Sequence, residues 1–302
     1  MKQQKKFFLF GLLFAMPWII GFFIFNLYPI LASFYYSLTE YNILQPPKFV
    51  GLDNYKYLFN DNSRFNASLY NTLYICLFSV PLNLIFSLAM AMLLSMQVKG
   101  QSIYRTIYYL PSVISVVASS VVWVWVLNPE YGILNTVLGF FNLPQPVWLA
   151  DPVFTKPALI IMGMWASGGT MLIYLAAIKG VPQSLYEAAD LDGAGSWKKF
   201  RHITIPAIST ATLFQLIMGL IYGFQYFTQA YVFISGSNNS TADGGPENSL
   251  LFYAIQLYQE GFRFLNMGVA SAMAWILFVI IVIVTYIVFK TSLRWVYYGG
   301  GD

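Results

Sequence analysis

Residues 264–289 read FLNMGVASAMAWILFVIIVIVTYIVF, a run without Asp, Glu, Lys, Arg or His. An α-helix rises about 1.5 Å per residue, so about 20 apolar residues cross a hydrocarbon core about 30 Å thick. Backbone amides in lipid must be satisfied within the segment, and the run lacks the alternation of a β-barrel strand, so it is predicted to be helical. Five more such runs occur, at Phe7–Tyr36, Leu69–Gln97, Thr106–Asn128, Pro157–Ile178 and Ala207–Ser235.

The six runs predict an all-α integral membrane protein with six transmembrane helices. The chain is 58% hydrophobic and 9% charged, whereas soluble domains carry roughly 25% charged residues. No loop is long enough for a soluble domain, so residues 1–302 are expected to form one transmembrane domain. The first run follows Lys2, Lys5 and Lys6, as in a signal peptide, but it exceeds a secretory h-region of about 7–15 residues. We therefore expect an uncleaved first helix.

The positions of Lys and Arg predict the orientation, since cytoplasmic loops carry an excess of both. With the N-terminus inside, eleven of these residues fall on the inner side and five on the outer side. Both termini are therefore predicted to be cytoplasmic. The net charge of +4 reflects this sidedness and indicates no nucleic-acid partner.

The loop of residues 179–206, between the fourth and fifth runs, is predicted to form two short helices. Ser184 precedes Glu187 by three residues, the spacing of a capping box that opens a helix. Gly193 is suited to end that helix with a positive φ, and Ser196 is expected to cap the second helix. A short helix with small alanines on one face suits insertion into a groove of another protein.

An ordered set of residues runs through this loop: Glu187-Ala188-Ala189, Asp192-Gly193-Ala194, Phe200, Ile203 and Pro206. Further members are Lys99-Gly100, Arg105, Leu110-Pro111, Trp123, Gly132-Ile133-Leu134-Asn135, Gly244-Gly245-Pro246 and Gly268-Val269-Ala270-Ser271-Ala272. The set resembles permease subunits of bacterial binding-protein-dependent ABC importers of the maltose and glycerol-3-phosphate type, whose cytoplasmic EAA loop corresponds to residues 179–206. The resemblance covers almost the whole chain.

This resemblance implies that the loop helix is a coupling helix seated in a cleft of a separate ATPase. The residues expected to make or shape that contact are Leu185, Glu187, Ala188, Ala189, Asp190, Gly193, Phe200 and Pro206. The implied partners are a second permease subunit, a cytoplasmic ABC ATPase dimer, an extracellular substrate-binding protein and membrane lipid. ATP and Mg²⁺ would be bound by the ATPase, with no cofactor and no catalysis in this subunit. The implied location is the inner or plasma membrane of a bacterial cell.

Two runs carry residues suited to a sugar, which is bound by stacking on aromatic rings together with amide and hydroxyl groups. They are Trp165, Ser167 and Thr170 in the fourth run and Tyr222, Gln225, Tyr226 and Gln229 in the fifth. By the resemblance, Trp165, Tyr222 and Gln225 fall near positions that line the sugar cavity of maltose-type relatives. The alternative for each residue is packing against neighbouring helices or a place at the membrane interface.

Other functions stay open to different degrees. An ABC permease for a phosphorylated polyol is an alternative, although no basic residue lies within the fourth or fifth run to pair with phosphate. An ion-driven secondary transporter usually has Asp, Glu or His inside the bilayer, and the six runs contain none. An intramembrane enzyme would need a pair of catalytic residues within the helices, and the six runs contain no such pair. The chain has a single cysteine, Cys76, which excludes a disulfide within the chain. A passive channel would leave the loop of residues 179–206 unexplained.

Overall fold

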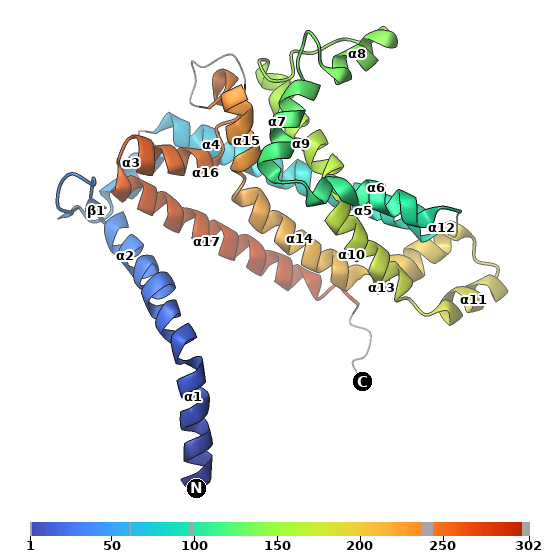
Figure 1. Ribbon diagram of the computed structural model, residues 1–302, viewed down its shortest axis with the longest axis horizontal. Coiled ribbons are helices and arrows are strands. Elements are labelled where there is room, and N and C mark those ends of the chain that lie inside the picture. The colour runs from blue at the N-terminus through green and yellow to red at the C-terminus, as the bar shows by residue number, and fades with distance from the viewer. Residues whose placement is uncertain (1, 61, 97–98, 237–243, 298–302) are drawn as a thin grey trace. The chain divides into compact units, whose positions relative to one another are not determined.

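The computed structural model describes residues 2–60, 62–96, 99–236 and 244–297, and Gln97, at the end of the second predicted run, lies outside them. Within these residues the regular structure is helical apart from one pair of two-residue strands (Figure 1). The chain divides into two compact units. The first comprises residues 1–62 and 257–279, and the second comprises residues 63–256 and 280–302.

The first unit contains a long apolar helix and a cap of short elements. These are α1 (Lys2–Phe22), η1 (Phe23–Leu27), α2 (Tyr28–Ser37), β1 (Thr39–Glu40), β2 (Lys48–Phe49), α3 (Asp53–Asn60), η5 (Gln259–Arg263) and the start of α17 (Met267–Ser292). The strands pair antiparallel, with Thr39 opposite Phe49. The buried Asn54 Nδ2 donates to the carbonyls of Ser37 and Thr39, both at 2.9 Å, which fixes the end of α2. The Trp275 indole of α17 donates to Ser33 Oγ at 3.2 Å.

The second unit holds the remaining elements. They are α4 (Ser63–Tyr74), η2 (Ile75–Ser79), α5 (Val80–Ser95), α6 (Gln101–Val113), α7 (Val116–Val126), α8 (Ile133–Phe140), α9 (Pro152–Trp165), α10 (Gly168–Lys179), α11 (Gln183–Leu191), α12 (Ser196–Lys199), η3 (Phe200–Thr204), α13 (Ile205–Ala207), α14 (Ser209–Phe224), α15 (Thr228–Gly236), η4 (Pro246–Asn248), most of α16 (Tyr253–Tyr258) and the end of α17. One apolar core centres on Leu127, Leu159 and Phe252. A second core joins α5, α10 and Ile208.

The predicted runs differ in how they cross the membrane. Three helical stretches among the described residues are continuous and apolar enough to span it: 10–37, 63–95 and 267–292. The expectation of a single helix was wrong for the other three runs, because each is broken. The helix pairs α6–α7 and α9–α10 bend by 101° and 48°, and the helical stretch Ser196–Ala207 bends by 64° against α14; counting each bent pair as one span gives up to six. The predicted fifth run also breaks a second time, between α14 and α15.

Proline positions account for three of the π-helical segments. η1, η2 and η3 are each followed by an α-helix with proline at its second position, namely Pro29, Pro81 and Pro206. Proline has no N–H and its ring collides with the carbonyl four residues earlier. Widening the preceding turn to a π-type pattern relieves that collision, as at other helix distortions.

A buried polar node fixes the segment that follows Gly244-Gly245-Pro246. Asn71 Nδ2 donates to the carbonyls of Asn248 at 2.7 Å and Leu251 at 3.0 Å. Lys156 Nζ donates to Asn71 Oδ1 at 2.9 Å and lies over the Tyr70 ring at 5.7 Å from its centroid. The lysine charge is thus held by an amide and aromatic faces at the start of α9, and α4 and α9 are joined to this segment.

Gly168 permits the close approach of α10 to α6. A Cβ at this position would lie 2.5 Å from the Tyr108 carbonyl oxygen and 2.8 Å from the Tyr109 Cα, both backbone atoms that cannot rotate away. A Cβ at the neighbouring Gly169 would meet nothing within 4 Å. The two adjacent glycines therefore differ sharply in what they tolerate.

We expect Gly168→Ala to destabilise the protein by about 1–3 kcal/mol, the cost of forcing an extra carbon into a packed contact. Gly169→Ala is the matched control and should unfold at the wild-type temperature or slightly above it, since alanine favours a helix. Thermal unfolding of both purified variants in detergent measures the difference. Equal melting temperatures would contradict the packing role of Gly168.

Candidate functional site

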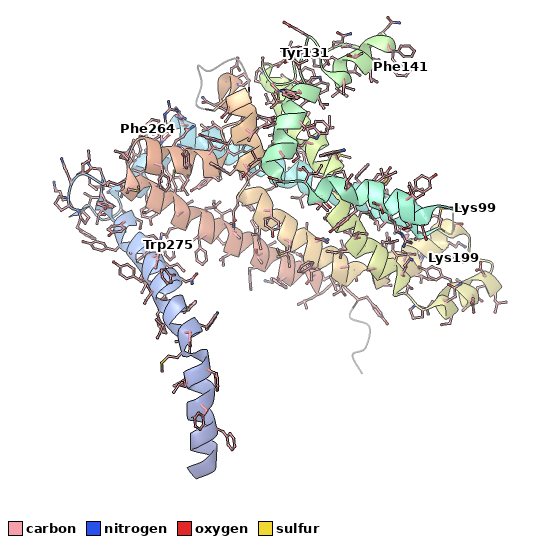
Figure 2. The ribbon with its side chains drawn as sticks, viewed as in Figure 1. Lys99, Tyr131, Phe141, Lys199, Phe264 and Trp275 are labelled. Carbon is pink, nitrogen blue, oxygen red and sulfur yellow. The ribbon has the colours of Figure 1, made fainter. Side chains whose placement is uncertain are left out.

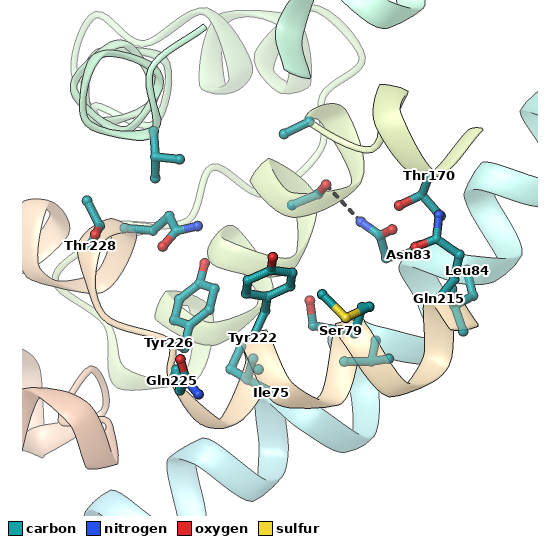
Figure 3. A pocket seen from close by; sticks show the side chains of 18 of the residues that line it. Ile75, Ser79, Asn83, Leu84, Thr170, Gln215, Tyr222, Gln225, Tyr226 and Thr228 are labelled. Atoms are coloured by element: carbon teal, nitrogen blue, oxygen red, sulfur yellow. Dashed lines mark hydrogen bonds between the residues drawn. The ribbon is translucent and has the colours of Figure 1, made fainter. Parts of the chain in front are cut away.

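A cavity of about 490 Å³ lies in the second unit, between η2 and α5 on one side and α9, α10, α14 and α15 on the others (Figure 3). Its lining residues are Ile75, Ser79, Val80, Asn83, Leu84, Val116, Gly163, Ala166, Thr170, Gln215, Met218, Gly219, Tyr222, Gly223, Gln225, Tyr226, Phe227, Thr228 and Gln229. None of these described residues is an Asp, Glu, Lys, Arg or His. The wall therefore offers aromatic rings, amides and hydroxyls but no formal charge.

Helix breaks contribute to this wall. Val116 begins α7 directly after the α6–α7 break, and Ala166 lies between α9 and α10. Residues 225–227 form the break between α14 and α15. Irregular backbone at membrane depth is tolerated where it is buried in protein or lines a cavity. The bends therefore place non-helical backbone in the cavity wall.

Five of the seven residues predicted to contact a sugar line the cavity: Thr170, Tyr222, Gln225, Tyr226 and Gln229. Trp165 and Ser167 lie outside the lining. The Trp165 ring packs edge-on against Trp123, with centroids 5.9 Å apart, and the Ser167 residue is buried. α9 ends at Trp165, so its last residue turns away and Ala166 faces the cavity instead.

The sequence reasoning missed the lining residues Ser79, Asn83, Gln215 and Thr228. A pattern could have found three of them. Gln215 precedes Tyr222 by seven residues, and Ser79 precedes Asn83 by four, so each pair shares a helix face. Thr228 follows Gln225 by three residues, but it opens α15 after the break at residues 225–227, so helical spacing does not relate the two.

The cavity wall on α14 is held close to η2 and α5 by two glycines. A Cβ at Gly219 would lie 2.9 Å from Val80 Cγ1, and one at Gly223 would lie 2.9 Å from Cys76 Sγ. Between them Tyr222 stays 65% exposed, whereas Tyr226 stacks edge-on against Phe252 with centroids 5.3 Å apart. The two tyrosines therefore differ: Tyr222 presents a free ring face, and Tyr226 is anchored in the core.

The loop of residues 179–206 forms the two predicted short helices, but their starts differ from expectation. The predicted capping box at Ser184 and Glu187 is wrong, because α11 begins at Gln183 with Pro182 as the N-cap and has no side-chain cap. Pro182 has φ −57° and ψ 129°, and its carbonyl accepts from Leu185 N at 3.2 Å. The prediction for Ser196 is wrong by one residue, since Gly195 is the N-cap of α12 and no side chain caps it.

The end of α11 agrees with the sequence. Gly193 has φ +68°, its N–H donates to the Asp190 carbonyl at 3.0 Å, and Ala194 N donates to the Ala189 carbonyl at 2.9 Å. These two bonds are those of a Schellman motif, in which a left-handed residue closes the helix. Glycine adopts this conformation without steric cost.

Side-chain contacts hold α11 against α12 and η3. Asp190 forms an ion pair with Lys199, so this predicted ATPase contact also has a partner within the loop. The Tyr186 hydroxyl lies 2.9 Å from Thr204 Oγ1, and Trp197 packs on Phe200 with ring centroids 5.5 Å apart. The first two pairs join α11 to α12 and η3, and the third joins α12 to η3, so the three pairs brace the loop.

The outer surface of this braced loop carries exposed apolar side chains among charged ones. Leu191 is 91% exposed and Trp197 68% exposed, with Leu185 also exposed. Of the other predicted coupling residues, Glu187 and Ala188 are exposed, while Ala189, Phe200 and Pro206 are half-buried. In Figure 2, Lys99 and Lys199 lie at this end of the second unit, and Tyr131 and Phe141 lie at the opposite end.

Comparison with known proteins identifies relatives along almost the whole chain. Residues 64–298 match the family described as binding-protein-dependent transport system inner membrane component. The chain is 39% identical to the probable ABC transporter permease protein YesP of Bacillus subtilis (strain 168), over 95% of this chain and 92% of that protein. It is 32% identical to the lactose transport system permease protein LacF of Rhizobium radiobacter, over 93% of each chain.

The fold also resembles a solved structure. A chain in the crystal structure of a bacterial alginate ABC transporter, in complex with alginate pentasaccharide-bound periplasmic protein, superposes with a TM-score of 0.80 at 23% identity. The likeness covers 96% of both chains. The chain therefore has the ABC permease fold.

The contrast between the two cavity tyrosines gives a stability prediction. Tyr226→Ala should lower the free energy of unfolding by about 3 kcal/mol, since it empties space against the buried Phe252. Tyr222→Ala should change it by less than about 0.5 kcal/mol, because that ring is mostly exposed. Thermal unfolding in detergent compares the two. A larger loss for Tyr222→Ala would show that its ring packs rather than lines the cavity.

Proposed function

This chain belongs to the family of inner membrane components of binding-protein-dependent transport systems, and on that premise we propose that it is one of two permease subunits of a sugar importer. The two subunits would together form the path for a sugar or oligosaccharide delivered by an extracellular binding protein. The permease named for lactose transport, among the relatives, supports this substrate class. The energy for transport would come from ATP hydrolysed by a separate subunit.

The observation that carries the proposal is the uncharged polar wall of the cavity. Thr170, Tyr222, Gln225 and Gln229 supply a ring face, hydroxyls and amides from three elements. Sugars present the same combination in reverse, with an apolar ring face and a rim of hydroxyls that both donate and accept. A phosphorylated polyol would favour Arg or Lys in the wall, and the described lining has neither. The wall therefore favours a neutral sugar.

We further propose six membrane spans with both termini in the cytoplasm. The three continuous spans and three bent pairs support the number. The position of Lys99 and Lys199 at one end of the second unit supports the orientation, since basic residues collect on the cytoplasmic side (Figure 2). In this arrangement α11 and α12 face the cytoplasm and α8 faces outside.

The braced loop would be the coupling element. Its exposed apolar Leu185, Leu191 and Trp197 and its exposed acidic Glu187 suit contact with a cleft with a basic wall in an ATPase dimer. ATP and Mg²⁺ would be bound by that ATPase, and this chain would hold no cofactor. Because Asp190–Lys199 and Tyr186–Thr204 brace the loop, a push on α11 would move α14 through η3 and α13 as a rigid body.

Glu187→Lys should uncouple ATP hydrolysis from uptake, because it reverses the charge offered to the ATPase while leaving the end of α11 unchanged. Uptake in vesicles containing the assembled importer should fall at least tenfold, with the subunit still present in the membrane. Ser184→Ala is the matched control on the same helix, since Ser184 makes no capping bond. Undiminished uptake by Glu187→Lys would remove that residue from the coupling surface.

The proposed function is tested by reconstitution with the partner permease, the ATPase and the binding protein that co-purify from the native membrane. Uptake of a labelled neutral sugar should require ATP and should persist when a proton ionophore is added at constant ATP. This follows because no charged residue lies in the described cavity wall to couple transport to an ion. Collapse of uptake under the ionophore would favour an ion-driven transporter instead.

A further inference from the structure

One polar side chain of the cavity has hydrogen-bonding capacity that the protein does not use. Gln215 lines the cavity from α14 and is 8% exposed, so more than nine-tenths of it is buried. Its Nε2 atom is covered and has no hydrogen-bond partner within the part of the chain that the structure describes. A buried donor without a partner is unfavourable for folding and rare in native proteins.

The neighbouring amide in the wall differs in this respect. Asn83 Nδ2 donates to the carbonyl of Gly163 at 3.0 Å, in the last turn of α9, where carbonyls lack helical partners. Asn83 Oδ1 accepts from Ser87 Oγ at 3.4 Å. Asn83 therefore holds α5 against α9, whereas Gln215 makes no such hydrogen bond within the described chain.

The position of Gln215 extends the cavity beyond the aromatic site. Gln215 and Tyr222 are seven residues apart on one face of α14, which separates them by two turns or about 10 Å along the axis. Figure 3 shows Gln215 and Thr170 at one end of the cavity and Gln225 and Thr228 at the other. A ligand that stacks on Tyr222 and reaches Gln215 must extend along α14.

Building on the function proposed above, we propose that Gln215 is a specificity residue whose amide, covered at Nε2 in this structure, turns toward the Thr170 end of the cavity and binds the hydroxyls of a neutral sugar there. A glutamine amide offers two N–H donors and one oxygen acceptor, so adjacent hydroxyls satisfy both sides at once. A site built to bond a hydroxyl rejects an analogue that lacks it, because the buried amide is then left unpaired. The Nε2 donor, which has no partner within the described residues, gives this selection.

The test compares Gln215→Leu, which keeps the approximate volume and removes the amide, with Phe214→Leu as the control. Phe214 adjoins Gln215 on α14, is 55% exposed and is not part of the cavity wall. The assembled importer in vesicles is supplied with saturating binding protein and with radiolabelled lactose or maltotriose. Sugar imported and ATP hydrolysed are measured together.

Gln215→Leu should lower the sugar imported per ATP hydrolysed about tenfold, which corresponds to about 1.4 kcal/mol. Stimulation of ATP hydrolysis by the loaded binding protein should remain, and so should the melting temperature, because an unpaired buried amide has been removed. Gln215→Asn, which retains a shorter amide, should recover part of the ratio. Phe214→Leu should match wild type.

Two results would overturn the inference alone: an unchanged ratio in Gln215→Leu, or a lower melting temperature with parallel loss of ATP hydrolysis, which indicates a structural role. A different result would overturn the proposed substrate class. In that case the wild-type importer carries neither sugar, and the inference on Gln215 falls with it. The two failures are distinct, because failure of the Gln215 inference appears only in the variant, whereas failure of the substrate class already appears in the wild type.

Discussion

The constraint behind this structure is that backbone N–H and carbonyl groups must be satisfied where water is absent. It explains why the regular structure of the described residues is almost entirely helical, and it makes every interruption of a membrane helix costly. Interruptions therefore occur where a compensating contact exists. The Asn83 amide satisfies a carbonyl at the end of α9, and π-type turns precede Pro29, Pro81 and Pro206. Breaks that meet this condition also bring non-helical backbone to the cavity.

The cavity follows from those breaks together with close helix packing. Gly219 and Gly223 bring α14 against Val80 and Cys76, so this side of the cavity is tightly closed. On the opposite side Ala166 interrupts the wall between α9 and α10 and leaves room. Small residues thus determine where backbones touch, and breaks determine where they do not. The polar groups that line the remaining space then decide what can enter it.

Apolar length was enough to predict the helical fold class and the position of most helices, because burial in lipid depends on composition alone. It could not predict the bends, since a run such as Thr106–Asn128 has the same hydropathy straight or folded by 101°. Gly193 was predictable because its positive φ is a local property. Ser184 was not, because Pro182 competes for the same helix start. The spacing of Gln215 and Tyr222 could have placed Gln215 in the cavity wall, but only the packing shows that its amide nitrogen has no partner.

The two functional regions place opposite demands on their side chains. In the proposed function the loop of α11 and α12 transmits force, and two polar pairs, Asp190–Lys199 and Tyr186–Thr204, join its helices. The cavity must instead keep hydrogen-bonding groups available, because a group already paired within the protein gains nothing from a ligand. Its polar wall includes both kinds, Asn83 paired and Gln215 unpaired. Within the cavity wall, the lack of an internal partner therefore distinguishes Gln215, the proposed recognition residue, from Asn83, which holds α5 against α9.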